Sequence, residues 1–465
     1  MEFSSVERTT VSHIVAMPFP GRGHINPMMN LCKLLSSKSK KHHLLITFVV
    51  TEEWLGYIGS DPKPNNIRFA SIPNVVPPER LKAADFPGFY EAVMTKMEAP
   101  FEELLDQLEH PVDAMLGDVE LLWTISVGNR RNIPVASVWT MPAVFFSMLH
   151  HWNLFLPNRH LPLNSLELGK QHVDHIPGLS STQVADLQTI IHETDPRVLQ
   201  LAMECISRVP KAQFLLLTSA YELEPQAFDT LNAIFPFPVY PIGPAIPYLE
   251  LEHNSSITRT HNIPDYLQWL DSHPADSVLY ISLGSFLSVS FTQMDEIAAG
   301  LRNSGVRFLW VARGEASRLK ENCGDLGLVV PWCDQLKVLC HSSVGGFWTH
   351  CGWNSTLEAI FAGVPMLTFP LFLDQVPISR RIVEDWKIGW RVKRSTVGSD
   401  MSVTKEEISE LVQRFMNVES EEGKELRERA RGLKDICRQA TVEGGSSYTN
   451  LDAFLEGISQ SHVDH

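Results

Sequence analysis

Apolar runs and amphipathic segments alternate along this chain from its N-terminus onward. Residues 12–20 form an apolar run, a short turn follows, and residues 28–35 carry apolar side chains at helical spacing. Residues 44–50 form a second continuous apolar run, of the kind that parallel sheets bury on both faces. Similar runs occupy residues 113–119 and 133–140. Strands that alternate with helices in this way predict a doubly wound α/β fold.

The alternation stops near residue 241 and starts again after residue 264. The intervening segment is rich in proline and polar residues and has no sustained period, which predicts a linker. Strands are then expected at 277–285, 306–312, 344–349 and 364–370. We therefore expect an α/β domain over residues 1–243, a linker over 244–264, a second α/β domain over 265–440, and a C-terminal segment over 441–465 that ends in a short helix.

Composition and charge narrow the class of protein. The chain has 465 residues, of which 44% are hydrophobic and 20% are charged, as in a globular protein with an ample core. Its formal net charge of −15 argues against a nucleic-acid-binding protein, because phosphates require a basic surface. No run approaches the ~18–20 apolar residues of a membrane helix, and the N-terminal segment is polar, so we expect a cytoplasmic protein. The seven cysteines include no Cys-x-x-Cys pair, which predicts reduced core thiols and no metal site.

The turn GRGHIN at residues 21–26 lies between the first predicted strand and the first predicted helix. It resembles a dinucleotide fingerprint in which Asn26 replaces the third glycine, and the acidic pair at 52–53 ends the second strand roughly where a ribose-binding acid would lie. A nicotinamide oxidoreductase is therefore one hypothesis. Asn26 followed by Pro27 fits a helix N-cap and first turn, so the helix is expected to begin just after His24.

His24 also suggests a catalytic role. It lies at the carboxyl edge of the first predicted strand, where open α/β sheets bind ligands, and Asp118 ends another predicted strand at the same edge. A histidine that is oriented and stabilised by an aspartate is a general-base pair. No serine or cysteine in a Gly-x-Ser-x-Gly frame accompanies the pair. We therefore predict that His24 deprotonates a substrate hydroxyl with Asp118 as its partner.

A second polar cluster occurs in the stretch WTHCGWNSTLEAIFA at residues 348–362. Asn354 and Ser355 stand where a helix with apolar spacing is expected to begin, and His350 precedes them in a loop that contains a glycine. Free N–H groups at a helix N-terminus, with a glycine and a histidine beside them, suit a phosphate. These residues by themselves are equally consistent with an ordinary capped core helix.

The surrounding residues favour a nucleotide sugar as the ligand. Trp332 offers an aromatic face for a base, Gln335 and Glu358 offer groups for a ribose diol, and Asp374 and Gln375 offer groups for sugar hydroxyls. Together with the anion site, these groups match a nucleotide sugar from its base to its sugar.

The segment from Trp332 to Gln375 closely resembles the 44-residue signature of the plant UDP-dependent glycosyltransferases of small molecules. The resemblance extends over nearly the whole chain, through PGRGHINP, SLGS at 282–285 and RFLWVAR at 307–313. Two departures from the family pattern are Asp334, where proline is frequent, and Gly117 before the catalytic-type aspartate. Neither removes a functional side chain.

The resemblance implies a GT-B fold, in which two Rossmann-like domains face each other across a cleft and the final helix packs back on the N-terminal domain. It implies that Trp332 stacks on uracil, that Gln335 and Glu358 bind ribose, and that Asp374 and Gln375 bind the sugar. The remaining expected donor-binding residues are Thr140, Ser285, Cys333, His350, Trp353, Asn354 and Ser355.

The resulting prediction is an inverting transfer of a sugar, expected to be glucose, from a UDP-sugar to a hydroxyl of a small lipophilic acceptor. The donor is a co-substrate, no cofactor or metal is expected, and the chain is expected to be a monomer. Candidate acceptor-binding residues are the aromatic side chains of Phe19, Trp54, Phe86, Phe89, Trp139 and Phe145. The sequence does not choose among phenolics, flavonoids, hormones and terpenoids. A nucleotide-sugar-binding regulator is the remaining alternative, but such a protein is expected to lose the base or its partner, and both are retained.

Overall fold

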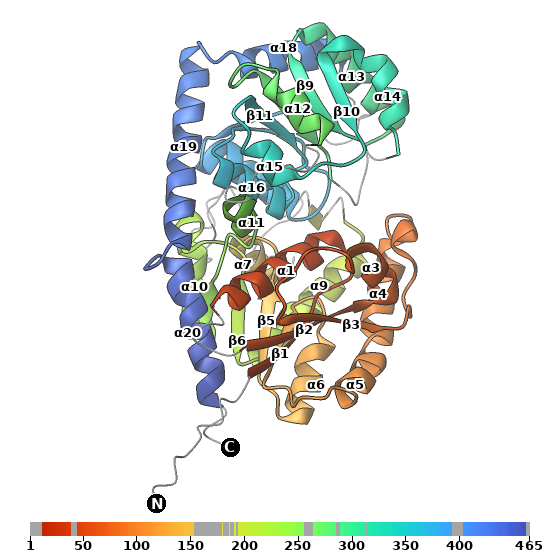
Figure 1. The fold of residues 1–465 in the computed structure, drawn as a ribbon, viewed down its shortest axis with the longest axis vertical. Helices are drawn as coiled ribbons and strands as arrows, with labels where there is room; N and C mark the ends of the chain where they lie inside the picture. Colours follow the sequence, from red (N-terminus) through yellow and green to blue (C-terminus); the bar gives the residue numbers. More distant parts are fainter. Residues whose placement is uncertain are drawn as a thin grey trace, which may run out of the picture.

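The computed structural model describes residues 12–38, 44–152, 194–254, 264–284, 289–312, 314–392 and 403–461, together with residues 179, 186, 190 and 191. Two β-sheets follow one another along the long axis of the molecule (Figure 1). The first sheet contains β1 (Ser12–Met17), β2 (Leu44–Thr51), β3 (Ile67–Ile72), β4 (Ala114–Asp118), β5 (Val135–Trp139), β6 (Phe214–Leu217) and β7 (Val239–Pro241). The second contains β8 (Val278–Ser282), β9 (Arg307–Val311), β10 (Gly327–Val330), β11 (Val344–Thr349), β12 (Met366–Thr368) and β13 (Gly389–Arg391).

Helices separate the strands throughout both halves. In the first half they are α1 (Arg22–Ser37), α3 (Glu52–Ile58), α4 (Phe86–Lys96), α5 (Glu98–Asp106), α6 (Trp123–Arg131), α7 (Ala143–His150), α9 (Pro196–Arg208) and α10 (Pro225–Ile234). In the second half they are α12 (Asp265–Asp271), α13 (Phe291–Ser304), α14 (Ala316–Cys323), α15 (Gln335–Leu339), α16 (Trp353–Ala362), α17 (Gln375–Arg380) and α18 (Lys405–Met416). Strand β2 is buried at every position, because the sheet is covered on both faces.

The strand orders are β3-β2-β1-β4-β5-β6-β7 and β10-β9-β8-β11-β12-β13, and all neighbouring strands are parallel. The predicted pair of doubly wound sheets is thus confirmed. In each sheet the order reverses once, between β1 and β4 in the first and between β8 and β11 in the second. Loops leave in opposite directions at such a switch point and open a crevice at the carboxyl ends of the strands. The predicted polar clusters lie at these two crevices.

Helix α1 begins earlier than the sequence suggests. Its N-cap is Gly21, and the backbone N–H groups of His24 and Ile25 both donate to the Gly21 carbonyl, at 3.0 and 2.9 Å. The expectation that the helix begins after His24 was wrong, because Pro27 is tolerated inside the helix instead of starting it. His24 therefore lies in the first turn of α1, with its ring close to the positive end of the helix dipole.

Part of the segment predicted as a linker, residues 244–264, is helical. It contains α11 (Tyr248–Asn254), and Tyr248 stacks on Phe361 of α16 with ring centroids 5.5 Å apart. The linker prediction specified no helix, and the contact of Tyr248 with Phe361 joins this part of the segment to the second half.

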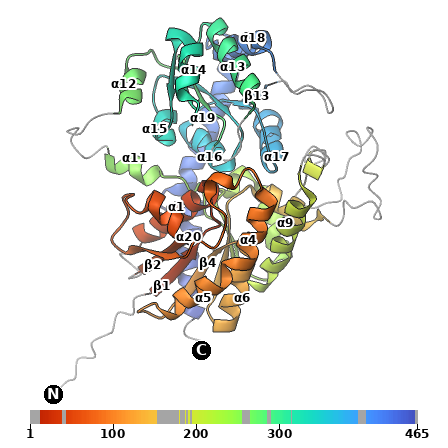
Figure 2. The same ribbon diagram turned by 90° about the vertical axis from the view of Figure 1, so that its right-hand side faces the viewer.

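Two C-terminal helices, α19 (Glu421–Thr441) and α20 (Ser446–Ser461), form a column along one side of both halves (Figures 1 and 2). Helix α19 packs on α16, and α20 returns to the first sheet, where Asn450 donates to the Pro241 carbonyl at 2.9 Å and Lys38 pairs with Asp452 at 2.7 Å. This column therefore holds the two halves in a defined relation.

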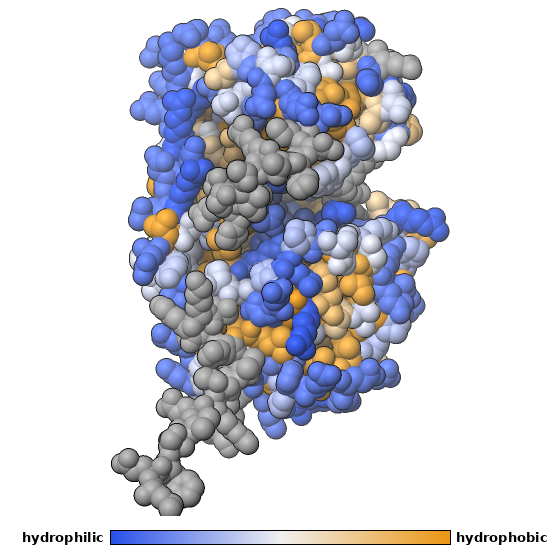
Figure 3. All heavy atoms as spheres, in the orientation of Figure 1, coloured by the Kyte–Doolittle hydropathy of each residue, from blue (hydrophilic) through white to orange (hydrophobic). Residues whose placement is uncertain are grey.

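Hydrophilic residues cover most of the face shown in Figure 3, as the charge of the chain leads one to expect. Within the described residues, no helix is long and apolar enough to cross a membrane.

All seven cysteines are free, and six are buried. The expectation of core thiols was wrong for Cys340, which is exposed at the end of α15.

Candidate active site

His24 and Asp118 meet at the switch point of the first sheet. His24 follows β1 and Asp118 ends β4, and these strands pair directly, with Met17 opposite Gly117. The His24 Nδ1 atom lies 2.9 Å from Asp118 Oδ2, and the Asp118 side chain is only 1% exposed. The backbone N–H groups of Phe19 and Glu120 also donate to this carboxylate, at 3.3 and 3.0 Å. These bonds hold the carboxylate so that Nδ1 of His24 is the protonated nitrogen and Nε2 is left as the basic one.

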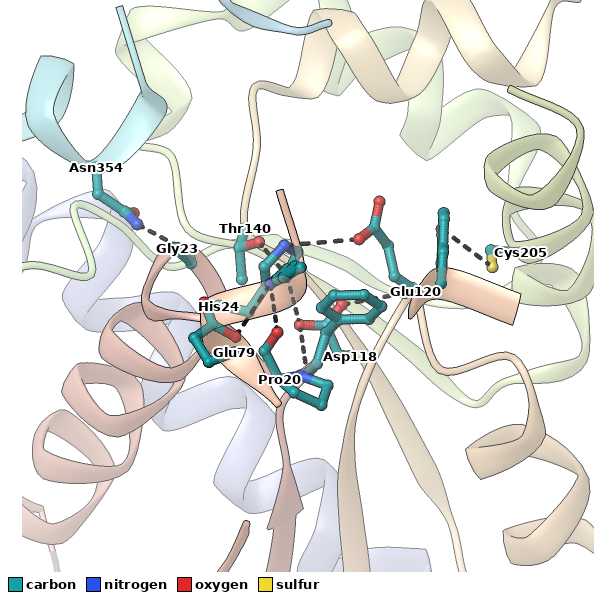
Figure 4. Close-up of polar contacts among 12 residues, drawn as sticks. Pro20, Gly23, His24, Glu79, Asp118, Glu120, Thr140, Cys205 and Asn354 are labelled. Atoms are coloured by element: carbon teal, nitrogen blue, oxygen red, sulfur yellow. Dashed lines mark hydrogen bonds and ion pairs between the residues drawn. The ribbon is translucent and has the colours of Figure 1, made fainter. Parts of the chain in front are cut away.

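Burial and charge act in opposite directions on His24. Burial by itself lowers the pKa of His24, but the carboxylates of Asp118 and Glu120 outweigh it, and the pKa is raised. Such a histidine is stabilised once it has accepted a proton. Thr140 also approaches Nδ1, with its hydroxyl 3.1 Å away, so this residue lies beside the base (Figure 4).

Three further charged residues surround the pair, and the sequence analysis did not single them out. Glu120 Oε2 lies 3.5 Å from His24 Nε2. Lys82 is buried and donates to the Pro20 carbonyl at 2.6 Å, and its ammonium lies 3.8 Å from Glu79. The signal for Glu120 was present, since it is an acidic residue two positions after Asp118 at the same sheet edge. No comparable signal marks Lys82, because it reaches the site from a distant loop.

The two departures from the family pattern have local explanations. A Cβ atom at Gly117 would lie 2.3 Å from the Thr124 hydroxyl, so the close approach of α6 to β4 requires glycine there. Asp334 is the N-cap of α15, and its side chain accepts from the Lys337 backbone N–H at 3.2 Å. Both residues therefore serve local packing or capping.

The helix N-terminus expected to bind an anion is that of α16. Its N-cap is Gly352, which provides no side-chain hydrogen bond, so Asn354 and Ser355 lie in the first turn and do not cap it. The alternative of an ordinary capped core helix does not describe this end. Among the described residues, buried polar atoms without a hydrogen-bond partner include His350 Nδ1, Trp353 Nε1 and Asn354 Oδ1, all at this one helix end. Such a cluster of unsatisfied atoms is expected where a polar ligand binds.

His350 is held between two glycines. A Cβ atom at Gly284 would lie 2.9 Å from its ring, and one at Gly352 would lie 2.5 Å from Nε2. Burial lowers the pKa of His350 to about 4, so the ring is neutral near pH 7 in the absence of an anion. A phosphate bound beside it would raise this pKa again. Ser285, the other expected phosphate contact, lies outside the described residues.

The residues expected to contact the uracil ring and the ribose lie next to α16. Trp332 is 57% exposed, which places a flat aromatic face at the surface. The Gln335 amide donates to Ser355 Oγ at 2.9 Å and to Glu358 Oε2 at 2.7 Å. Burial raises the pKa of Glu358 to about 7. Cys333 lies below this group, with its sulfur 3.4 Å from the Tyr280 hydroxyl.

Two predicted donor residues have mainly structural contacts. Trp353 is buried and stacks on Trp386, with centroids 6.3 Å apart. The Gln375 Oε1 atom accepts from the backbone N–H groups of Leu371 and Phe372, at 2.8 and 3.0 Å. Only the amide nitrogen of Gln375 is therefore left to meet a sugar hydroxyl.

The two halves touch at the active site. Asn354 Nδ2 donates to the carbonyl of Gly23 at 2.9 Å (Figure 4). In a regular helix this carbonyl would accept from the N–H four residues later, but that residue is Pro27, which has no N–H. Burial raises the pKa of Asp374 to about 7, and the charge of Glu120 adds to this increase. The N-terminus of α16 thus lies next to the His24–Asp118 pair, although the two belong to different halves of the molecule.

The six candidate acceptor aromatics fall into two groups. Five of them are buried in the cores, with at most 3% of the residue exposed: Phe19, Trp54, Phe89, Trp139 and Phe145. Trp139 also donates to the Pro142 carbonyl at 2.9 Å. Only Phe86 among the six is half-buried. Among the buried rings, Phe19 packs on His24 with centroids 5.1 Å apart. Phe89 packs on Phe19, with ring centroids 6.1 Å apart. Phe86 contacts Phe372 of the second half, with ring centroids 5.7 Å apart.

Within the described residues, no group of three or more His, Cys, Asp and Glu side chains is arranged to hold a metal ion. The site brings together the His24–Asp118 pair, the N-terminus of α16, which has no side-chain cap, and the exposed ring of Trp332.

Comparison with known proteins gives a consistent picture. Residues 195–417 match the family model of UDP-glucoronosyl and UDP-glucosyl transferases. The chain is 52% identical to UDP-glycosyltransferase 87A2 of Arabidopsis thaliana over 97% of each chain, and 33% identical to 7-deoxyloganetin glucosyltransferase of Catharanthus roseus over 99% of each. Its fold matches Medicago truncatula UGT71G1 complexed with UDP-glucose, with a TM-score of 0.77 and 25% identity over 97% of this chain and 99% of that one. Phytolacca americana UGT2 complexed with UDP-2fluoro-glucose and pterostilbene matches with a TM-score of 0.76 and 27% identity, over 97% and 100%.

Proposed function

This chain belongs to the plant UDP-glycosyltransferases, enzymes that transfer a sugar from a UDP-sugar to small-molecule acceptors, and we propose that it is an inverting glucosyltransferase with His24 as general base. Membership in this family also confirms the GT-B fold and rules out the nicotinamide oxidoreductase suggested by the GRGHIN turn. A regulator without turnover is likewise set aside, because the family members are enzymes.

One observation carries the proposal. Asn354, in the first turn of α16, is bonded to the carbonyl of Gly23, the residue directly before His24. A diphosphate at the N-terminus of α16 would therefore place the sugar next to the base.

In the proposed reaction, His24 Nε2 takes the proton of the acceptor hydroxyl while the oxygen of this hydroxyl attacks the anomeric carbon of the donor sugar. The bond from that carbon to the diphosphate breaks on the opposite face, so the configuration inverts. The negative charge that develops on UDP is stabilised by the N–H groups and dipole at the start of α16, together with His350 and Ser355. Asp118 stabilises the imidazolium that forms on His24.

The donor half of the site is proposed to bind UDP-glucose along the surface of the second sheet. Trp332 would stack on uracil, and Gln335 and Glu358 would hold the ribose. Asp374 and the Gln375 amide nitrogen would bind the glucose hydroxyls, with Thr140 approaching the sugar from the other half. Ser285, Cys333 and Trp353 complete the proposed donor set, the last two by packing beneath it.

The choice of glucose is tested by competition between two donors. With UDP-glucose and UDP-galactose present in equal amounts, we expect the glucoside to be the main product, because in this family a glutamine at the position of Gln375 accompanies glucose more often than galactose. Product analysis by mass spectrometry after hydrolysis and sugar separation measures the ratio. A clear preference for galactose would reject the assignment.

The uracil contact is tested by Trp332→Ala. We expect weaker UDP-glucose binding by about 1–3 kcal/mol, by analogy with base–aromatic stacking, and little change in acceptor binding. Calorimetric titration with UDP measures the effect. Phe291→Ala is a matched control, because Phe291 is an aromatic residue of the same half that is 65% exposed. Equal weakening of donor and acceptor binding would instead indicate a folding defect.

A further inference from the structure

Glu120 occupies the side of the base where the acceptor has to enter. It lies in the loop between β4 and α6, and its Oε2 atom is 3.5 Å from His24 Nε2. Asp118 contacts the other nitrogen of the same ring, so the two carboxylates flank the imidazole (Figure 4). If His24 is the base, as proposed above, an acceptor oxygen within hydrogen-bond distance of Nε2 also lies close to the Glu120 carboxylate.

The carboxyl group of Glu120 is well shielded from water. Its side chain is 12% exposed, and it is surrounded by groups from several elements. Burial raises its pKa, His24 and Lys82 lower it, Asp118 raises it, and a hydrogen bond from Tyr90 lowers it. The charge of Glu120 also raises the pKa of Asp374 in the second half. Asp118 and Glu120 therefore place two acidic side chains around the His24 ring, and Glu120 is the one beside Nε2.

This arrangement distinguishes between classes of acceptor. A hydroxyl donates its one proton to Nε2 and leaves Glu120 facing a lone pair. An acceptor with a second donor on the neighbouring carbon can bond to both groups at once. A carboxylate offers only hydrogen-bond acceptors and a negative charge, and it would meet a site rich in acidic groups.

We propose that Glu120 determines acceptor specificity by accepting a hydrogen bond from a second hydroxyl adjacent to the attacking one, so that the enzyme selects catechols and vicinal diols and rejects carboxylic acids. The proposal rests on the proposed function of the site. Glu120 is not required for the proton transfer itself, because Nε2 receives the proton of the attacking hydroxyl. Its effect therefore appears in the choice between acceptors.

The experiment compares catechol with 2-methoxyphenol, its monomethyl ether, which has lost the second donor. For the wild-type enzyme with UDP-glucose, we expect kcat/KM to favour catechol by about tenfold or more, as for a hydrogen bond to a charged group. Glu120→Gln keeps the shape but removes the charge, and Glu120→Ala removes the carboxyl group. We expect the preference to shrink in Glu120→Gln and to vanish in Glu120→Ala, and glucose-ester formation from benzoate to rise in both.

Because the readout is a ratio within one protein sample, a partly unfolded variant does not change it. Glu79→Gln is the matched control, since it removes a carboxylate from the same charged cluster without touching Nε2, and its ratio should equal that of the wild type. An unchanged ratio in Glu120→Ala would overturn the proposal. Equal losses on both acceptors would do the same and would make Glu120 a positioning residue for His24.

Acceptor binding in the presence of UDP, measured by calorimetry, separates this proposal from the proposed function. Tighter binding of catechol than of 2-methoxyphenol that disappears in Glu120→Ala would support the role of Glu120 even if the wild-type enzyme transferred no glucose to either. An absence of glucose transfer to either acceptor would contradict the proposed reaction, but it would not contradict the role of Glu120 in acceptor binding.

Discussion

Replacing His24 by alanine is expected to slow glucosyl transfer to an aliphatic alcohol by about 10²–10⁴-fold, the usual contribution of a general base. The alcohol does not ionise near neutral pH, so its proton has to be removed as the new bond forms. UDP-glucose binding should barely change, because the proposed donor contacts come mainly from the second half of the molecule. Initial rates at saturating donor, together with calorimetric titration of UDP, measure the two effects separately.

The choice of acceptor decides what a negative result means for His24→Ala. Activity retained on a weakly acidic phenol is compatible with the mechanism, since such an acceptor supplies its own anion near neutral pH. Full activity of His24→Ala on the aliphatic alcohol would contradict the mechanism. His341→Ala is a matched control, because His341 also pairs with an aspartate, Asp271, at 3.1 Å and its side chain is 17% exposed, as is that of His24. This control should transfer at the wild-type rate.

Asp118→Asn is expected to lower transfer by a factor of a similar order, about 10²–10⁴-fold, without unfolding the site. The asparagine amide can donate to Nδ1 of His24, which moves the imidazole proton to Nε2 and leaves the wrong nitrogen basic. The loss of charge also removes the largest of the contributions that raise the pKa of His24.

The sign of the pH effect follows from that change. The base works in its neutral form, so the rate rises as the pH passes the pKa of His24. With Asp118 replaced, this pKa falls, and the acid limb of the rate profile should move to lower pH. Profiles of kcat/KM against pH on the aliphatic alcohol measure the shift. An acid limb that stays in place would argue against the pairing of these residues, and Asp271→Asn should leave the profile unchanged.

Much of the fold can be predicted from the sequence. The continuous apolar runs correspond to β2, β4 and β11, because strands covered on both faces have to be apolar throughout. The pairing of His24 with Asp118 also follows, since each lies at the carboxyl end of a strand and doubly wound sheets bring such ends together. These features depend on local periodicity and on a topology that is common to the fold class.

Helix ends and loop connections were harder to predict. Asn26, Pro27, Asn354 and Ser355 all have the local chemistry of a helix start. The two helices begin earlier, at Arg22 and at Trp353, and each has a glycine as its N-cap. Local propensity contributes about 1 kcal/mol at such positions, and packing against the rest of the fold overrides it.

The alternation of strands and helices, the two polar sheet edges and the contact of His24 with Asp118 can all be inferred from the amino-acid sequence. Each depends on residues that are close in the chain or on the regular geometry of parallel strands. The folded chain sets the contact of Glu120 with Nε2 of His24 and the burial of Lys82 beside them. It also buries five of the six aromatic side chains that the sequence offered for the acceptor. It also decided that the carbonyl freed by Pro27 is bonded by Asn354 from the other half of the molecule. Contacts of this kind join residues far apart in the chain, and they are set by how two independently patterned halves pack, which no local pattern encodes.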